Sequence, residues 1–417
     1  MTKPKAARAK AARAKAAKAA KAKVTTAPVA STQTAKTQSG TIAGRIWFPQ
    51  VIRAVACLVV VFEHLGSFYP RSLQSTAAIA HFKPPKENSI QTPWTALADL
   101  TDSPHFSMGF MAVAMFFLVS GFVIPLSLRT TSAAEFTSKR VFRLYPTLAA
   151  CTLVTVFVFQ LQAHFLGVVQ PHGVKTTLMT MTLTAPFLNG TFVDPVMWTL
   201  VVEEIFYFTT ALMVWRNWQG KQFPLCAIGI VIVAIAALPA SDGSALFFAG
   251  NFGAFVPLVF VGTAIYHWYS GQWARDDAVR VGGCLFACFA AAMYLSGNNG
   301  HVSAYVLASV AAVGAFLGLI RLGPRLPYSR LLDRLSEITY PLYLLHYMCG
   351  VILLNWLATK DVSYFIALPV TIAAVVVGAI AIHLLIEEPM VKVGHRVARV
   401  VRARRSARAA APLNVRG

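Results

Sequence analysis

Long apolar runs, separated by short polar segments, follow one another from about residue 46 to about residue 386. A membrane-spanning helix needs about 20 predominantly apolar residues, and most of these runs reach that length. The pattern therefore predicts an all-α, polytopic transmembrane helical bundle of about ten spans. The predicted spans are residues 46–68, 107–128, 145–168, 196–215, 223–240, 247–268, 280–297, 303–320, 337–358 and 364–386.

Three segments fall outside this series of spans. The apolar stretch 176–192 is short and contains Pro and Gly, so we interpret it as a re-entrant or interfacial segment. Residues 1–45 are an Ala/Lys-rich tract followed by a polar linker, and residues 392–417 form a second basic tail. The membrane domain is thus expected at residues 46–391, between two basic tails.

Composition and charge agree with a membrane protein. Hydrophobic residues make up 56% of the chain and charged residues only 13%, with a formal net charge of +21. So few charges disfavour a soluble enzyme, a disordered hub or a coiled coil. Lys and Arg collect on one side of the predicted spans, which places both termini in the cytoplasm by the positive-inside rule. The loops on the other side hold only Arg71, Lys83, Lys86, Lys175 and Lys360.

The tails and the cysteines suggest little chemistry. The N-terminal tract lacks large apolar side chains, so we predict a disordered, solvated cytoplasmic tail. Contact with anionic lipid is the next interpretation, and no specific nucleic-acid binding is predicted. The six cysteines lie in apolar runs and are expected to be buried small hydrophobes. Neither a metal site nor a bound cofactor is predicted.

Ionisable groups inside membrane spans are costly and usually functional. Arg53 and His64 are eleven residues apart in the first span, which puts them on one helix face about 16 Å apart along the axis. The guanidinium suits a phosphate or carboxylate, and the imidazole suits proton transfer. The alternatives are an arginine that snorkels to the interface and a histidine that only packs.

Two later spans carry further polar side chains. Glu203 and Tyr207 share a helix face, and a carboxylate at this depth needs an Arg or His partner from another helix. Glu204 faces elsewhere and could simply lie at the interface. Tyr343 and His346 also share a face, although His346 could be a core histidine bonded to a carbonyl. His383 is unaccompanied and is more often structural.

A basic cluster precedes the third span. Arg140 and Arg143 are one helical turn apart, which would suit a phosphate clamp at the inner mouth of the bundle. Ordinary positive-inside charge explains them equally well. In the second span, the small residues of Ser120-Gly121-Phe122 allow a close helix approach or a kink.

Taken together, these motifs resemble the bacterial acyltransferase-3 family of integral membrane O-acyltransferases. The resemblance runs from about residue 46 to residue 391, in the family's order, with Thr199 where the family has Ser. Its motifs are Arg53 and His64; Phe116, Phe117, Ser120, Gly121 and Phe122; Arg140, Arg143, Tyr145 and Pro146; Trp198, Glu203, Phe206 and Tyr207; Tyr340, Tyr343, Leu344 and His346; and Glu387 and Pro389. The basic N-terminal tail is not a feature of the family.

The resemblance implies transfer of an acyl group, often acetyl, from cytoplasmic acyl-CoA to a hydroxyl of a cell-surface or exported glycan. It implies a multi-pass protein of the bacterial inner membrane. We then expect His64 to act as general base, with Glu203 orienting it, and His346 as a further catalytic residue. The donor would be bound by Arg53, Arg140 and Arg143, with support from Ser120, Trp198, Tyr207 and Tyr343.

Other functions fit the same spans. A transporter or flippase of a lipid-linked glycan would also bury charges among its spans, although we see no motif repeated between the two halves. Within the acyltransferase reading, the acceptor could instead be a small secondary metabolite, or the donor could be succinyl-CoA. Direct transfer and a relay through an acyl carrier on the protein also stay open.

Overall fold

A computed structural model describes residues 41–42, 45–85, 92–103, 105–128, 131–168, 172–297 and 302–410. The predicted disordered tail, up to residue 40, lies outside the described residues. The described chain is almost entirely helical, apart from two antiparallel pairs of two-residue strands. The pairs are β1 (Thr41–Ile42) with β2 (Arg45–Ile46), and β3 (Asp102–Ser103) with β4 (Phe106–Ser107).

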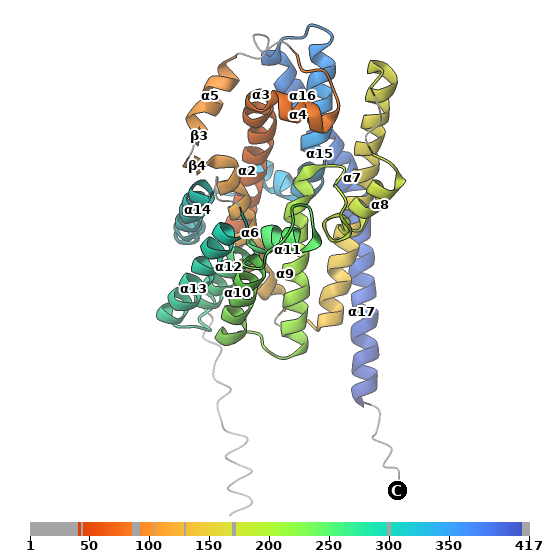
Figure 1. The fold of residues 1–417 in the computed structure, drawn as a ribbon. Helices are drawn as coiled ribbons and strands as arrows, with labels where there is room; N and C mark the ends of the chain where they lie inside the picture. The colour runs from red at the N-terminus through yellow and green to blue at the C-terminus, as the bar shows by residue number, and fades with distance from the viewer. Residues whose placement is uncertain are drawn as a thin grey trace, which may run out of the picture.

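Within these ranges, nine helices are long and apolar enough to cross a membrane, which confirms the predicted helical bundle. Figure 1 shows them packed side by side around α6 and α15. The helices of the bundle are α2 (Phe48–Phe62), α6 (Met108–Leu128), α7 (Ala133–Leu166), α9 (Trp198–Trp215), α10 (Gln222–Ala236), α11 (Ala245–Gly253), α12 (Val256–Tyr269), α13 (Arg275–Leu295), α14 (Val302–Leu322), α15 (Arg330–Ala358), α16 (Tyr364–Ile382) and α17 (Glu388–Ala410).

The span expected at residues 223–240 is shorter in the structure than the sequence predicts. It corresponds to α10, which has 15 residues. At 1.5 Å per residue such a helix covers only about 22 Å, less than the roughly 30 Å of a hydrocarbon core. The neighbouring run at 247–268 divides into α11 and α12, with Pro257 at the start of α12. In the described part of the chain, the bundle thus has nine long spans and one short apolar helix.

Shorter helices fill the connections. The stretch 176–192, expected to be re-entrant or interfacial, contains α8 (Val174–Met181) and the 3-10 turn η3 (Ala185–Leu188). The long connection between the first two spans carries α3 (Tyr69–Arg71), α4 (Leu73–Ala80) and α5 (Pro93–Thr101). Two more 3-10 turns are η4 (Pro195–Met197), directly before α9, and η5 (Gly323–Arg325), after α14.

Glycines let α6 and α12 cross in direct backbone contact. A Cβ atom on Gly121 would lie 1.8 Å from the Val259 carbonyl oxygen, and one on Gly262 would lie 2.3 Å from that of Leu118. Thr263 donates a hydrogen bond to the Gly121 carbonyl, at 3.0 Å. Small residues permit this kind of crossing inside membranes. The close approach expected at Gly121 is therefore present, and it fixes the adjoining Ser120.

Two helices contain a π-helical segment at a polar position. The segment η1 (Glu63–Phe68) continues α2 and includes His64, whereas η6 (His383–Glu387) joins α16 to α17 and includes the buried Glu387. The wider turn of a π-segment turns side chains away from the direction that an α-helix would give them, and such segments are frequent at functional sites.

Candidate active site

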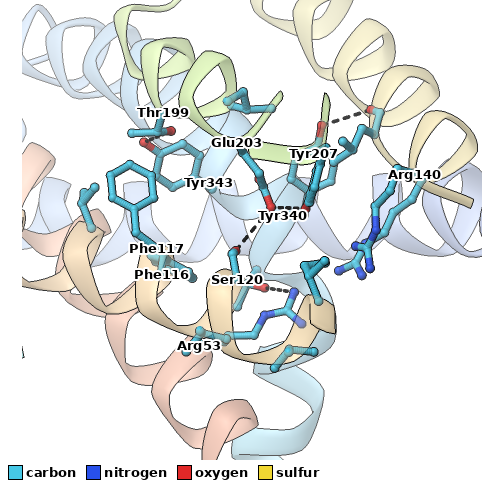
Figure 2. Close-up of a pocket in the computed structure, with 18 of the residues that line it drawn as sticks. Arg53, Phe116, Phe117, Ser120, Arg140, Thr199, Glu203, Tyr207, Tyr340 and Tyr343 are labelled. Carbon is cyan, nitrogen blue, oxygen red and sulfur yellow. Dashed lines mark hydrogen bonds between the residues drawn. The ribbon is translucent and has the colours of Figure 1, made fainter. Parts of the chain in front are cut away.

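A pocket opens among α2, α6, α7, α9 and α15, five helices from distant parts of the chain. Figure 2 shows its polar side chains converging from these helices. The pocket is lined by Arg53 of α2, Ser120 of α6, Arg140 and Arg143 of α7, Thr199, Glu203 and Tyr207 of α9, and Thr339, Tyr340 and Tyr343 of α15. We call it the donor pocket below, after the role that the sequence predicts for its arginines.

Glu203 is held on the pocket wall by two hydroxyl groups. The Tyr207 hydroxyl, one turn along α9, donates a short hydrogen bond to Glu203 Oε1. Ser120 Oγ donates to the same oxygen from α6, at 3.4 Å. Both bonds appear as dashed lines in Figure 2. Hydrogen bonds to an ionised acceptor are stronger than neutral ones, so Glu203 ties α6 to α9.

Three guanidinium groups line the same pocket. Arg53 donates to Thr339 Oγ1 at 3.2 Å, and the Nε of Arg143 lies 3.9 Å from Glu387 Oε1. Arg140 lies over the Tyr207 ring, 5.2 Å from its centroid. Its Nε is buried and has no hydrogen-bond partner among the described residues. A buried donor without a partner costs free energy, and an anionic ligand in the pocket would satisfy it.

Two histidines form a second buried cluster, farther along α15. His346 Nε2 lies 3.1 Å from His64 Nδ1, and His346 is fully buried. Tyr347 packs beside them, its ring centroid 4.8 Å from that of His64. His346 lies seven residues after Thr339, the residue to which Arg53 donates. The histidine pair is therefore about 10 Å from Thr339 along the α15 axis.

Hydrogen-bond geometry decides which nitrogen of His64 can act as a base. His346 Nδ1 lies 2.6 Å from the Tyr343 carbonyl oxygen, which can only accept, so Nδ1 carries the proton. In the neutral ring Nε2 of His346 is then an acceptor, and His64 Nδ1 must donate to it. His64 Nδ1 is also 3.0 Å from the Val60 carbonyl, which again requires a donor. Neutral His64 therefore carries its lone pair on Nε2.

The structure divides the predicted site residues between these two clusters. The donor pocket contains all three predicted donor-binding arginines, together with Glu203 and the supporting Ser120, Tyr207 and Tyr343. His64 and His346 pair with each other. Glu203 Oε1 accepts hydrogen bonds from Ser120 and Tyr207, and no hydrogen bond joins Glu203 to His64 among the described residues.

Tyr343 connects the two clusters. It lines the donor pocket, and its ring centroid is 5.4 Å from that of His346. Thr199 donates to the Tyr343 hydroxyl at 2.9 Å, and that hydroxyl donates to the Val196 carbonyl at 3.2 Å. Phe116 also lines the pocket, and its ring centroid is 6.3 Å from that of Tyr343. The substitution of Thr for Ser at position 199 keeps the hydroxyl that this network uses.

Trp198 stands outside both clusters. Its indole packs against Phe255, with ring centroids 4.7 Å apart, and against Phe117 and Phe252. Of these, Phe117 lines the donor pocket. Trp198 therefore supports the pocket through an aromatic cluster and does not line it.

Sequence reasoning assigned no role to two buried carboxylates. Asp194 is fully buried, and its two oxygens accept from the backbone N–H groups of Val196 and Met348, each at 3.1 Å. It thereby joins the start of α9 to α15, two residues from His346. Glu387 bonds His383 Nδ1 at 2.8 Å and approaches Arg143. In the sequence, the position of Asp194-Pro195 directly before a span was the available signal for Asp194. The Glu-x-Pro motif was the signal for Glu387.

Among the residues that the structure describes, no group of three or more His, Cys, Asp or Glu side chains is arranged to hold a metal ion. The site instead offers guanidinium groups, hydroxyl groups, one carboxylate and an imidazole pair. Such a set can bind an anionic substrate and transfer a proton.

Comparison with known proteins shows the family. The acyltransferase-3 family profile, described as an acyltransferase domain, matches residues 46–386, well over half of the chain. The protein therefore belongs to this family, and its long apolar helices are those of a multi-pass membrane protein.

Two curated relatives are similar over shorter stretches. "Nodulation protein 10" of Rhizobium leguminosarum bv. viciae is 34% identical over 170 residues, 35% of this chain and 43% of that protein. The "O-acetyl transferase" of Shigella phage Sf6 is 26% identical over 220 residues, 50% of this chain and 66% of that protein. The chain thus matches less than two thirds of the length of either relative. No solved structure is significantly similar to it.

Proposed function

We propose that this protein transfers an acetyl group from cytoplasmic acetyl-CoA to a hydroxyl of a cell-surface or exported glycan, in the inner membrane of a bacterium. The observation that carries the proposal is the pairing of an arginine-lined pocket with a buried histidine pair on the same two spans. The first span provides Arg53 and His64, and α15 provides Thr339 and His346. These two spans could hold both a donor and a base for the acceptor.

The direction of the reaction follows from the proposed topology. With both termini in the cytoplasm, Arg53 lies in the inner half of the first span and His64 in its outer half. Arg140 and Arg143 lie near the inner end of α7. The excess of Lys and Arg in the segments on this side supports the orientation. A donor would therefore enter from the cytoplasm, and a glycan acceptor from the opposite side.

CoA chemistry fits the donor pocket. The pyrophosphate of CoA is anionic, and a planar guanidinium binds phosphate through paired N–H donors. The unpartnered Nε of Arg140 is one such donor already positioned in the pocket. An acetyl group is the simplest acyl group to propose, because the phage relative is named an O-acetyl transferase.

In the proposed reaction, His64 Nε2 accepts the proton of the acceptor hydroxyl as its oxygen attacks the thioester carbonyl. The C–O bond forms, the C–S bond breaks, and the proton on His64 then passes to the departing CoA sulfur. His346 is a positioning residue that holds His64 in the required tautomer and touches no substrate. We assign Glu203 to the wall of the donor pocket, where its carboxylate lies among the guanidinium groups and orders Tyr207.

The decisive experiment uses membranes that contain the protein, supplied with labelled acetyl-CoA and succinyl-CoA in parallel. We expect label from acetyl-CoA to enter a glycan, and mass analysis of glycan from a strain lacking the gene to show loss of acetyl groups. Label found only in a small metabolite, or only from succinyl-CoA, would contradict the stated acceptor or donor. Movement of a glycan without any acyl donor would indicate a transporter.

A further inference from the structure

A second concave surface lies between α7, α9 and α17, near the ends of these helices. Its polar and aromatic lining includes Ser132 before α7, Trp215, Asn217 and Gln219 at the end of α9, and Arg404 and Arg405 of α17. We call it the basic groove. No carboxylate is among its lining residues. Figure 1 shows α17 running beside the lower half of α7 and extending past the end of α9.

The basic groove is in line with the donor pocket along two helices. On α7, Ala133 of the groove precedes Arg140 of the pocket by seven residues; on α9, Val214 of the groove follows Tyr207 of the pocket by seven. Both spacings correspond to about 10 Å along the helix axis. Because α7 and α9 run in opposite directions, the two offsets point the same way. The groove therefore lies directly beyond the pocket mouth, on the side to which we assign the cytoplasm.

The position of α17 beside the groove is fixed by specific contacts. Gly394 lets α17 approach α7 closely, since a Cβ there would lie 2.8 Å from Phe142 Cβ. Farther along, Arg402 Nε lies 3.4 Å from Glu135 Oε2, and Ser132 Oγ also donates to that carboxylate. Glu135, which does not line the groove, is thus already engaged, while Arg404 and Arg405 are exposed and line the groove.

The groove also offers a surface for a heterocyclic base. Trp215 is 67% exposed and lines it. Arg216 lies 5.0 Å from the Trp215 ring centroid, which adds a third cation nearby. Indole rings stack on nucleobases, and amide side chains such as Asn217 and Gln219 can bond their edges.

We propose that the basic groove binds the 3′-phosphorylated adenosine end of the acyl-CoA donor, with Arg404 and Arg405 on the 3′-phosphate and Trp215 against the adenine. The proposal rests on the proposed function, because it assumes a CoA donor. Trp215 follows Glu203 by twelve residues, about 18 Å along α9. The pantetheine arm and pyrophosphate of CoA extend over a length of this order, with the thioester at the opposite end.

Equilibrium binding of labelled CoA to the purified full chain in phosphatidylcholine nanodiscs tests this without knowledge of the acceptor. The probes are CoA and 3′-dephospho-CoA, and the variant is R404Q/R405Q. We expect the variant to bind CoA about tenfold more weakly than wild type, and to bind 3′-dephospho-CoA nearly as well as wild type does. The matched control is R396Q/R399Q, which removes two exposed arginines of α17 that do not line the groove and should leave both affinities unchanged.

The failures of this inference and of the proposed function are distinguishable. Wild type that binds no CoA would overturn both. CoA bound equally by wild type and R404Q/R405Q would overturn the groove assignment alone. If R404Q/R405Q also bound less phosphatidylglycerol than wild type does in nanodiscs of mixed lipid composition, the groove would be a site for lipid headgroups. Because Arg404 and Arg405 are exposed, we expect the variant to unfold at the temperature of wild type.

Discussion

The donor pocket and the histidine pair share two helices but have opposite electrostatic character. The pocket contains three guanidinium groups and a carboxylate, and the Nε of Arg140 there lacks a partner. Within the described residues, His64 and His346 hydrogen-bond to each other and to carbonyl oxygens, beside the Tyr347 ring. Burying a charge is far more costly than burying a neutral hydrogen-bonded group.

In the proposed reaction, this difference separates donor binding from proton transfer. An anionic donor needs cations, and it would offset the cost of keeping them in the membrane interior. A general base for a hydroxyl needs a free lone pair, which a neutral imidazole with a fixed tautomer provides. Substitutions in the two regions should therefore produce different defects, one in donor affinity and the other in the rate of transfer.

The largest effect is expected from H64A. General-base catalysis typically contributes a factor of about 10² to 10⁴, so acetyl transfer to the endogenous acceptor in isolated membranes should fall by about 10³. CoA affinity should stay within about twofold of wild type, because His64 does not line the donor pocket. The control H164A removes an exposed histidine at the end of α7 and should keep full activity. Full transfer by H64A would exclude His64 as the base.

R140Q tests the other region and should show the converse defect. A hydrogen bond to a charged group is worth about 1.5–3 kcal/mol, so CoA affinity should fall by about 10- to 100-fold. Transfer at saturating donor should change less. R140K should be only partly active, because an ammonium lacks the planar fork of a guanidinium. The control is R321Q, at an exposed arginine of α14. Unchanged CoA binding by R140Q would remove Arg140 from the donor site.

Substitutions of His346 should show how much of the proposed activity of His64 depends on the hydrogen bond between the two histidines. H346A removes the acceptor for His64 Nδ1–H and should reduce transfer by about 30-fold, a loss within the range seen for partners that orient a histidine. H346Q retains a carbonyl oxygen that can accept and an N–H group that can donate. It should recover most of that loss, with CoA affinity unchanged in both. Equal losses in H346A and H346Q would show that His346 does more than hold His64.

The sequence predicted the helical spans well, because apolar length is a local signal. It also placed Arg53 and His64 on one face of the first span, and both do contact α15. The shortening of α10 was less visible, since Leu238 and its neighbours extend the apolar run beyond the helix end. Hydropathy depends on residue composition, so it does not mark the residue at which the backbone of α10 leaves the helix.

Pairing between helices was the part that sequence could not supply. A carboxylate in a span indicates a partner but does not name it, and Glu203 has hydroxyl partners where we expected His64. His346 could be assigned to His64 only once α15 was seen to pack against the first span. Asp194 bonds the backbone of Met348, a contact that leaves no pattern in side-chain chemistry.

The smallest effect should come from Y343F, at the boundary between the two regions. The hydroxyl of Tyr343 bonds Thr199 and the Val196 carbonyl, whereas its ring separates the donor pocket from His346. Removing only the hydroxyl should reduce transfer about threefold, because a neutral hydrogen bond contributes roughly 0.5–1.5 kcal/mol. Y343A should alter the boundary itself and impair transfer more strongly. Y294F, at an exposed tyrosine of α13, is the control. Wild-type activity in Y343A would mean that the two regions work without this boundary, and the donor would then have to reach His64 by another route.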